Sequence, residues 1–248
     1  MNRQLGIIIL LLACGLLQLN AKVQLLPKPQ RINVSKGSFS IDKIRVISPV
    51  LTGEINSLIV RSGGNVTNLA DRSIEVEMLN SSTGLPTKSG EYYKIELTSK
   101  KVLIQARSTQ AVYWALQTLE QLRFIRNGKS YFPICEVIDW PAFPVRGFLH
   151  DTGRSFISMD ELKKEIALLS HFKVNVFHWH LTENQAWRLE SKIFPELNDS
   201  VNTTRFPGKF YTIDEAKELV EFCKSHQVML IPEIDMPGHS AVFERAFH

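Results

Sequence analysis

The sequence has little of what marks the specialised classes of protein. With only 13 glycines and 11 prolines in 248 residues, it is not collagen-like or of low complexity, and 44% hydrophobic residues exclude general disorder. The 29 basic and 25 acidic residues leave a formal net charge of +4, with no basic block of the kind that binds nucleic acid. Long apolar runs are absent after the first 21 residues, so no later segment is expected to span a membrane. What remains is a globular chain that can bury a sizeable core.

The single long apolar run lies at the N-terminus. Met1–Gln4 is polar with one cation, and Leu5–Leu17 is almost entirely apolar. This pattern is typical of a secretory signal and is too short for a spanning helix. We expect residues 1–21 to be a cleaved signal peptide; the alternative is a bacterial lipoprotein signal in which Cys14 carries a lipid anchor. The protein is therefore expected to be secreted or periplasmic in a bacterium, or anchored at the cell surface.

Cysteine is also scarce, which limits disulfide bonding. Of the three cysteines, Cys135 and Cys223 follow the leader, and an oxidising compartment would allow one bridge between them. One lies near a change in the sequence pattern and the other on an expected helix. We therefore predict two separate buried thiols, neither of them catalytic.

Residues 22–141 are predicted to form a small α+β domain without a recognisable reactive site. Alternation of apolar and polar residues indicates half-buried strands, and two of these flank a turn as a hairpin. A helix with an apolar stripe at spacings of three and four follows them. The expected strands are Lys43–Ser48, Ser73–Met78, Tyr92–Leu97 and Val102–Ala106, and the helix covers 109–124 with Val112, Ala115, Leu116, Leu119 and Leu122 inward. The proline-rich run 139–144 interrupts regular structure and marks the boundary.

Residues 142–248 show a different rhythm, in which strands alternate with helices. Ser158 with Glu161, and Thr212 with Glu215, have the spacing of capping boxes that begin helices. The order strand, helix, strand, helix, strand predicts parallel pairing with right-handed crossovers, as in a doubly wound sheet or a (β/α)8 barrel. No glycine-rich loop follows the first strand, so a nucleotide-binding sheet is disfavoured. The expected strands are 145–150, 174–181 and 228–234.

Charged and aromatic side chains gather where these three strands end, which is where parallel α/β proteins build active sites. Three interpretations are open. His178 and His180 alternate on one strand and could ligate zinc with a carboxylate, although His-x-His alone is a weak signal. Carboxylates, an arginine and tryptophan rings also suit a carbohydrate. In the third interpretation the strand residues are ordinary core, which we favour for His178 and for Trp179.

Three motifs then carry a resemblance to a known family. They are RGFLHDTGR at Arg146–Arg154, HWHLTENQAWR at His178–Arg188 and PEIDMPGH at Pro232–His239. In this order and spacing they resemble the exo-β-N-acetylhexosaminidases of glycoside hydrolase family 20. The segment from Leu26 through the helix at 109–124 also looks like that family's non-catalytic N-terminal α/β domain.

The resemblance implies a (β/α)8 barrel that removes terminal N-acetylglucosamine or N-acetylgalactosamine from glycans with retention. It implies substrate-assisted chemistry, in which the acetamido oxygen of the sugar attacks the anomeric carbon, and it implies no metal or organic cofactor. Arg154 matches the arginine that clamps ring hydroxyls of the terminal sugar. His239 matches the histidine that links a carboxylate, here Glu183, to the catalytic acid. Asp235 matches a buried supporting acid, with capping of the turn at Met236–Gly238 as its alternative.

The sequence departs from the family pattern in two ways. Glu183 and Asn184 stand where the family commonly has two aspartates, so the chain must shift or the side chain must bend for Glu183 to meet His239. The catalytic Asp-Glu pair expected after a fourth strand is also not found before His248. We therefore expect a small domain followed by the first three strands and two helices of an incomplete barrel, inactive alone. The alternatives are a non-catalytic carbohydrate-associated binding protein and, less favoured, a metal-dependent barrel hydrolase; the oligomeric state is left open.

Overall fold

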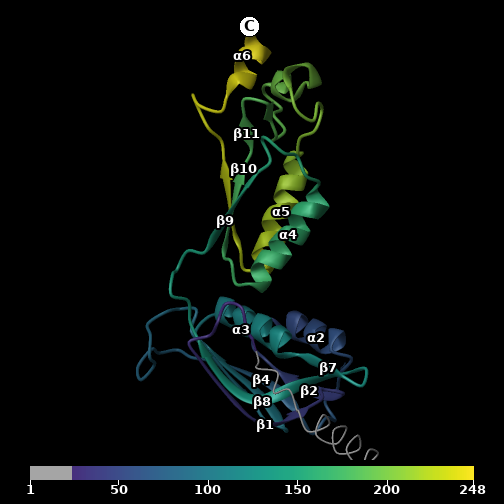
Figure 1. Ribbon diagram of the computed structural model, residues 1–248, viewed down its shortest axis with the longest axis vertical. Helices are drawn as coiled ribbons and strands as arrows, with labels where there is room; N and C mark the ends of the chain where they lie inside the picture. The colour runs from purple at the N-terminus through teal and green to yellow at the C-terminus, as the bar shows by residue number, and fades with distance from the viewer. Residues whose placement is uncertain (1–23) are drawn as a thin grey trace, which may run out of the picture.

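The computed structural model describes residues 24–248, which form two parts joined by a single crossing of the chain (Figure 1). The signal peptide and the lipid-anchor site predicted at Cys14 lie outside the described residues. Within residues 24–248, no helix is long and apolar enough to cross a bilayer. The two parts are stacked end to end, with the helices of the N-terminal part facing the second part.

The N-terminal part is one mixed sheet covered by two helices. The strand order is β1-β8-β5-β6-β4-β2-β3, with β7 paired to β8. The predicted hairpin is confirmed, because β5 and β6 pair antiparallel. The five predicted core residues of α3 are all buried, at most 3% exposed. The elements are β1 (Arg31–Phe39), β2 (Lys43–Ile47), α2 (Thr52–Arg61), β3 (Asn65–Val66), β4 (Ser73–Met78), β5 (Tyr93–Leu97), β6 (Lys101–Ala106), α3 (Thr109–Leu122), β7 (Phe124–Arg126) and β8 (Lys129–Asp139).

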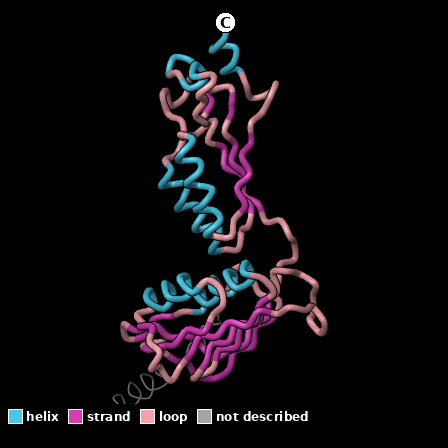
Figure 2. Tube along the Cα trace, turned by 180° about the vertical axis from the view of Figure 1, so that it is seen from behind, coloured by secondary structure: helices cyan, strands magenta, loops and turns pink. Residues whose placement is uncertain are grey.

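The second part is a three-stranded parallel sheet, ordered β13-β10-β9, with helices α4 and α5 on one face (Figure 2). Both predicted capping boxes are present, at Ser158 and at Thr212, and they fix where the two helices begin. The elements are β9 (Gly147–Asp151), α4 (Met159–His171), β10 (Val176–His180), β11 (Thr182–Glu183), β12 (Ala186–Trp187), η1 (Pro195–Asn198), η2 (Ser200–Asn202), α5 (Ile213–Ser225), β13 (Met229–Glu233) and α6 (Ala241–Phe247).

The core of the second part lies between the sheet and the two helices. Phe177 and Trp179 of β10 point to that side and are each 1% exposed, against Leu162 of α4 and Leu219 of α5. The Trp179 ring packs edge-on against the Tyr211 ring at 4.8 Å between centroids. Trp179 is therefore a packing residue, as favoured from the sequence. Cys135 and Cys223 are likewise buried and free, so no disulfide links the two parts within residues 24–248.

Buried charges tie the two parts together at the base of β9 and β10. Lys173, in the turn before β10, places its Nζ 2.8 Å from the Asp139 carboxylate and 2.7 Å from the Tyr93 hydroxyl, both in the N-terminal part. Arg146, just before β9, binds both carboxylate oxygens of Glu91 at 2.6 and 3.2 Å. The N-terminal part thus holds the chain just before β9 and β10, and the carboxyl ends of these two strands carry the polar motifs.

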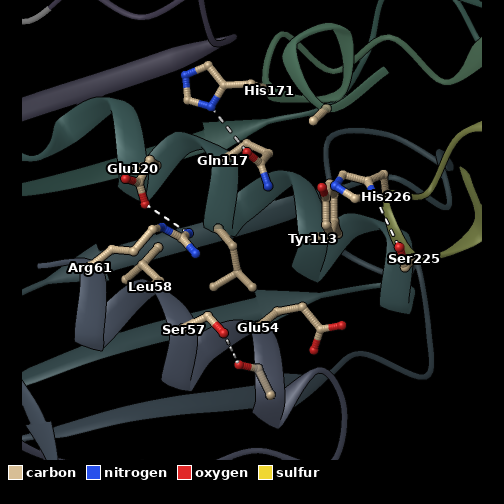
Figure 3. Close-up of a pocket in the computed structure, with 13 residues that line it drawn as sticks. Glu54, Ser57, Leu58, Arg61, Tyr113, Gln117, Glu120, His171, Ser225 and His226 are labelled. Atoms are coloured by element: carbon tan, nitrogen blue, oxygen red, sulfur yellow. Dashed lines mark hydrogen bonds and ion pairs between the residues drawn. The ribbon is translucent and has the colours of Figure 1, made fainter. Parts of the chain in front are cut away.

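A polar cleft of about 640 Å³ also lies between the parts, beside α2 and α3 (Figure 3). Arg61 and Glu120 form an ion pair across it at 3.3 Å, and His171 contacts Gln117 at 3.2 Å. Because His171 ends α4, this cleft opens at the base of the sheet, opposite the strand ends that carry the motifs. It is therefore separate from the candidate active site.

His171 should make stability depend on pH. Burial lowers the pKa of this imidazole below its usual value, reinforced by the charge of Lys173 and opposed by Glu120. The unfolded chain therefore takes up a proton on His171 more readily, and stability should fall as the pH drops from about 6.5 towards the lowered pKa. The urea midpoint at pH 7.5 and 5.5 should differ less in His171→Asn than in the parent chain. The exposed His248→Asn is the control. A urea midpoint that changes with pH as much in His171→Asn as in the parent chain would contradict the role of His171 in this pH dependence.

Candidate active site

The polar motifs meet at one edge of the parallel sheet. In register, Asp151 lies beside His180, and His180 lies beside Glu233. All three residues end their strands, so the segments that follow begin at the same level. Glu183 ends β11, the short strand that follows β10, and His239 lies in the loop after β13. Elements far apart in the sequence therefore deliver their polar side chains to one place, as predicted from the strand order.

A carboxylate joins an arginine to a histidine at this edge. Glu183 is only 2% exposed in its side chain, and its Oε1 lies 2.6 Å from His239 Nδ1 and pairs with the guanidinium of Arg154. Arg154 and His239 remain accessible, with 48% and 44% of their side chains exposed. The structure thus brings together three of the four predicted site residues, with the acid beneath and two donors facing outward.

The Glu183 side chain bends where it meets His239. Its second oxygen, Oε2, accepts a hydrogen bond from the Asn184 backbone amide, so the longer side chain turns back on its own backbone. Burial acts to raise the pKa of Glu183, but the Asn184 amide, the hydrogen bond from His239 and the charge of Arg154 outweigh it. The carboxylate is therefore held ionised at neutral pH.

Asp151 is a site residue that the sequence places at a strand end without giving it a role. Its Oδ1 accepts from the Arg154 backbone amide at 2.9 Å, and its Oδ2 accepts from the Arg154 guanidinium at 2.6 Å. Two carboxylates, Asp151 and Glu183, thus hold Arg154 in one orientation. The signal available in the sequence is the spacing of acid and arginine three residues apart at the end of a strand.

Asn184 has a structural contact in place of the charge that the family commonly carries there. Its side-chain Oδ1 accepts from the Ala241 amide at the start of α6, at 3.3 Å, and its backbone carbonyl accepts from Arg245 at 2.6 Å. His239 has a left-handed backbone, with φ of 52°, two residues before Ala241. Asn184 therefore helps to hold the loop that presents His239.

Asp235 is half-buried within residues 24–248, whereas the resemblance implies a buried supporting acid. Among residues 24–248 its carboxylate forms no hydrogen bond to the turn at Met236–Gly238, and its backbone amide donates to Thr182 Oγ1 at 2.9 Å. An oxygen of Asp235 lies within 4.8 Å of ligand atoms of His180 and Glu233. Asp235 thus belongs to a second polar group, together with His180 and Glu233, which is distinct from the cluster of Arg154, Glu183 and His239.

The zinc interpretation rested on His178 and His180, and both of them contact Glu233. Glu233 Oε2 lies 2.6 Å from His178 Nε2 and 3.0 Å from His180 Nδ1. Burial acts to raise the pKa of Glu233, but the hydrogen bond and charge of His180 and the charge of His178 outweigh it and lower the pKa. His180, Glu233 and Asp235 each offer a ligand atom within 4.8 Å of the others, so the geometry alone leaves the zinc interpretation open. The contacts of His178 and His180 with Glu233 also fit interior histidines partnered by a carboxylate, which is the interpretation favoured for His178.

Comparison with known protein families decides between the remaining interpretations. The model described as "Glycosyl hydrolase family 20, catalytic domain" matches residues 143–248, and "Glycosyl hydrolase family 20, domain 2" matches residues 22–140. The chain belongs to glycosyl hydrolase family 20. Together the two matches cover nearly the whole sequence, including all three motifs.

Family 20 relatives agree with this assignment over most of the chain. A β-hexosaminidase of Porphyromonas gingivalis is 32% identical over an alignment of 241 residues, which covers 88% of this chain and 31% of the relative. A β-N-acetylhexosaminidase of Cellulomonas fimi is 30% identical over an alignment of 232 residues, which covers 88% of this chain and 47% of the relative. The chain thus spans about a third to a half of the length of these curated relatives.

Solved structures of the family have the same fold. The exo-β-N-acetylglucosaminidase of Vibrio harveyi in complex with N-acetylglucosamine superposes with a TM-score of 0.76 and 28% identity, covering 90% of this chain and 37% of that one. The β-N-acetylhexosaminidase of Bacteroides fragilis gives 0.73 and 27%, covering 89% and 47%. The family 20 arrangement of an α/β domain followed by a catalytic domain therefore extends to this chain.

Proposed function

We propose that this chain supplies the sugar-holding part of the active site of a β-N-acetylhexosaminidase. The observation that carries the proposal is the Arg154–Glu183–His239 cluster at the strand ends, in a chain of family 20. The planar guanidinium of Arg154 offers several fixed donors, which suits the adjacent hydroxyls of a sugar ring. The substrates would be glycans that end in N-acetylglucosamine or N-acetylgalactosamine.

In the proposed mechanism the residues described here bind and orient, and they do not transfer the glycosyl group. Asp151 and Glu183 hold Arg154 against the hydroxyls of the terminal sugar. His239 donates from Nδ1 to Glu183, which leaves Nε2 to contact the general acid, and Asp235 supports the site from below. The acetamido group of the substrate would act as nucleophile, with a separate Asp-Glu pair to orient it and to protonate the leaving group.

The proposal extends to the architecture and the location of the protein. The three parallel strands β9, β10 and β13, with helices on one face only, are proposed as the first strands of a (β/α)8 barrel. The apolar N-terminal run supports export, so the substrates would be met outside the cytoplasm.

Hydrolysis of an aryl N-acetyl-β-glucosaminide tests whether the residues described here bind and orient the sugar without transferring the glycosyl group. The purified 248-residue chain is expected to show no hydrolysis above its Arg154→Ala variant, because no Asp-Glu pair follows the motifs in this sequence. Activity of the parent chain above that variant would contradict this division of roles. The gene beyond codon 248 is the second test: we expect an in-frame continuation that encodes an Asp-Glu pair. A stop codon there in independent isolates would favour the non-catalytic alternative.

A further inference from the structure

Arg188 is a buried cation that the proposed mechanism does not use. It directly follows β12, and its residue exposure is 0%. Buried arginines are normally paired with a carboxylate. Within the described residues, however, none lies within ion-pair distance of Arg188.

The guanidinium instead donates five hydrogen bonds to backbone carbonyls. Five is also the number of N–H donors that an arginine has, so the group is fully satisfied. Burial lowers the pKa of Arg188 to about 10, which still leaves it protonated at neutral pH. The bonds run from Nε to Thr152 O at 3.0 Å, from Nη2 to Gly153 O at 3.2 Å and Arg205 O at 2.8 Å, and from Nη1 to Phe206 O at 3.3 Å and Lys209 O at 2.7 Å.

These carbonyls belong to two separate segments. Thr152 and Gly153 form the turn that leads directly into Arg154, and 205–209 lies in the long connection before α5. One side chain therefore holds the backbone of the sugar-binding turn to a loop about 50 residues further along the sequence.

The same turn also packs against the Glu183 segment, which runs from His180 to Glu183. Thr152 donates to the His180 carbonyl from its amide at 3.1 Å and from its hydroxyl at 2.9 Å. A Cβ added to Gly153 would lie 2.9 Å from the Glu183 Cβ, closer than such atoms approach in proteins. The turn thus contacts both the Glu183 segment and the guanidinium of Arg188.

We propose that Arg188 is a positioning residue for Arg154: it holds the Thr152–Gly153 turn so that the Arg154 guanidinium stays on Glu183 and faces the sugar. Arg188 itself is fully buried and does not touch the ligand. The link to sugar binding rests on the proposed function, whereas the control of Arg154 follows from the contacts alone. A lysine keeps the charge but has three donors on one atom, so it cannot reach both segments in the same way.

The test compares Arg188→Met and Arg188→Lys with the matched control Arg205→Met, which changes an exposed arginine on the loop that Arg188 holds. The main readout is the ¹⁵N spectrum of the arginine side chains, with Arg154→Lys used to assign the Arg154 signals. In the parent chain the Arg154 Nη–H signals should be separate, because Asp151 and Glu183 slow the rotation of the group. They should merge in Arg188→Met, recover in part in Arg188→Lys and stay unchanged in Arg205→Met.

Circular dichroism establishes that each variant is folded. Unchanged Arg154 signals in folded Arg188→Met would overturn the proposal, and so would loss of folding in both Arg188 variants, since Arg188 would then serve folding in general. Titration with N-acetylglucosamine is the second readout, with affinity expected to fall at least tenfold in Arg188→Met and less than twofold in Arg205→Met. Failure of the parent chain to bind this sugar would count against the proposed function, while the arginine spectrum would still decide the role of Arg188.

Discussion

Glu183→Gln is expected to lower kcat/KM of the proposed hexosaminidase by a factor of about 30 to 4,000. The substitution keeps the shape of the side chain but removes the charge that Arg154 and His239 share. Loss of one partner of a buried, hydrogen-bonded charge pair has an effect of about 2–5 kcal/mol, and each 1.4 kcal/mol is tenfold in rate. Steady-state kinetics of the proposed enzyme with an aryl N-acetyl-β-glucosaminide gives the value.

Glu165→Gln is the matched control for this prediction. Glu165 also contacts a histidine, with its Oε2 2.7 Å from His150 Nδ1, but on α4, which lies on the helix-covered face of the sheet. The same change of charge there should alter kcat/KM less than tenfold. Equal losses in the two variants would show that Glu183 acts only through general stability.

The lowered pKa of Glu183 adds a pH effect to the same variant. A carboxylate whose folded pKa lies below its unfolded value stabilises the folded chain above about pH 4.5, and this contribution is lost as the pH falls through the folded value. The parent chain should therefore lose more stability between pH 6 and 3 than Glu183→Gln does. Denaturant unfolding at the two pH values measures the difference.

Lys173→Met is expected to destabilise the chain by about 3 kcal/mol. The substitution keeps the apolar stem but leaves the Asp139 carboxylate buried without its cation, and breaking a buried pair in this way has an effect of about 3–5 kcal/mol. The lower end applies because the Tyr93 hydroxyl and the Gln30 and Trp140 amides still donate to Asp139. Equilibrium unfolding in urea gives the value.

Two further variants separate pairing from other effects of the Lys173 substitution. The double variant Lys173→Met/Asp139→Asn should recover part of the loss, because the uncompensated charge is gone. Lys217→Met breaks a highly exposed pair with Asp214 and should change little. A loss for Lys173→Met no larger than that for Lys217→Met would contradict the buried pair.

Local patterns in the sequence predicted much of the fold. The capping boxes at Ser158 and Thr212 fix the starts of α4 and α5 because a cap depends on residues three apart. The hairpin of β5 and β6 was predicted for the same reason. The pairing of β1 with β8, which places Arg31 beside Ile138, depends on residues far apart in the chain, and no local pattern indicates it.

The site was predictable to the extent that it follows from strand ends and motifs. Arg154, Glu183 and His239 come together because parallel strands end at one edge. The bend of Glu183, the half exposure of Asp235 and the burial of Arg188 depend on side-chain packing between segments. In the sequence alone, Lys173 looks like any surface lysine, because the acid that binds it belongs to the other part of the chain.

The ion pairs that hold the N-terminal part to the sheet have a mechanical consequence. Lys173 and Arg146 hold the chain just before β10 and β9, and the far end of a five-residue strand lies about 16 Å from its start. Each strand therefore begins beside a contact with the N-terminal part and ends at Asp151 or at the segment that leads to Glu183. A small tilt at Asp139 or Glu91 would therefore displace Asp151 and the start of the segment that carries Glu183, so the N-terminal part can influence the geometry of the Arg154–Glu183–His239 cluster from a distance.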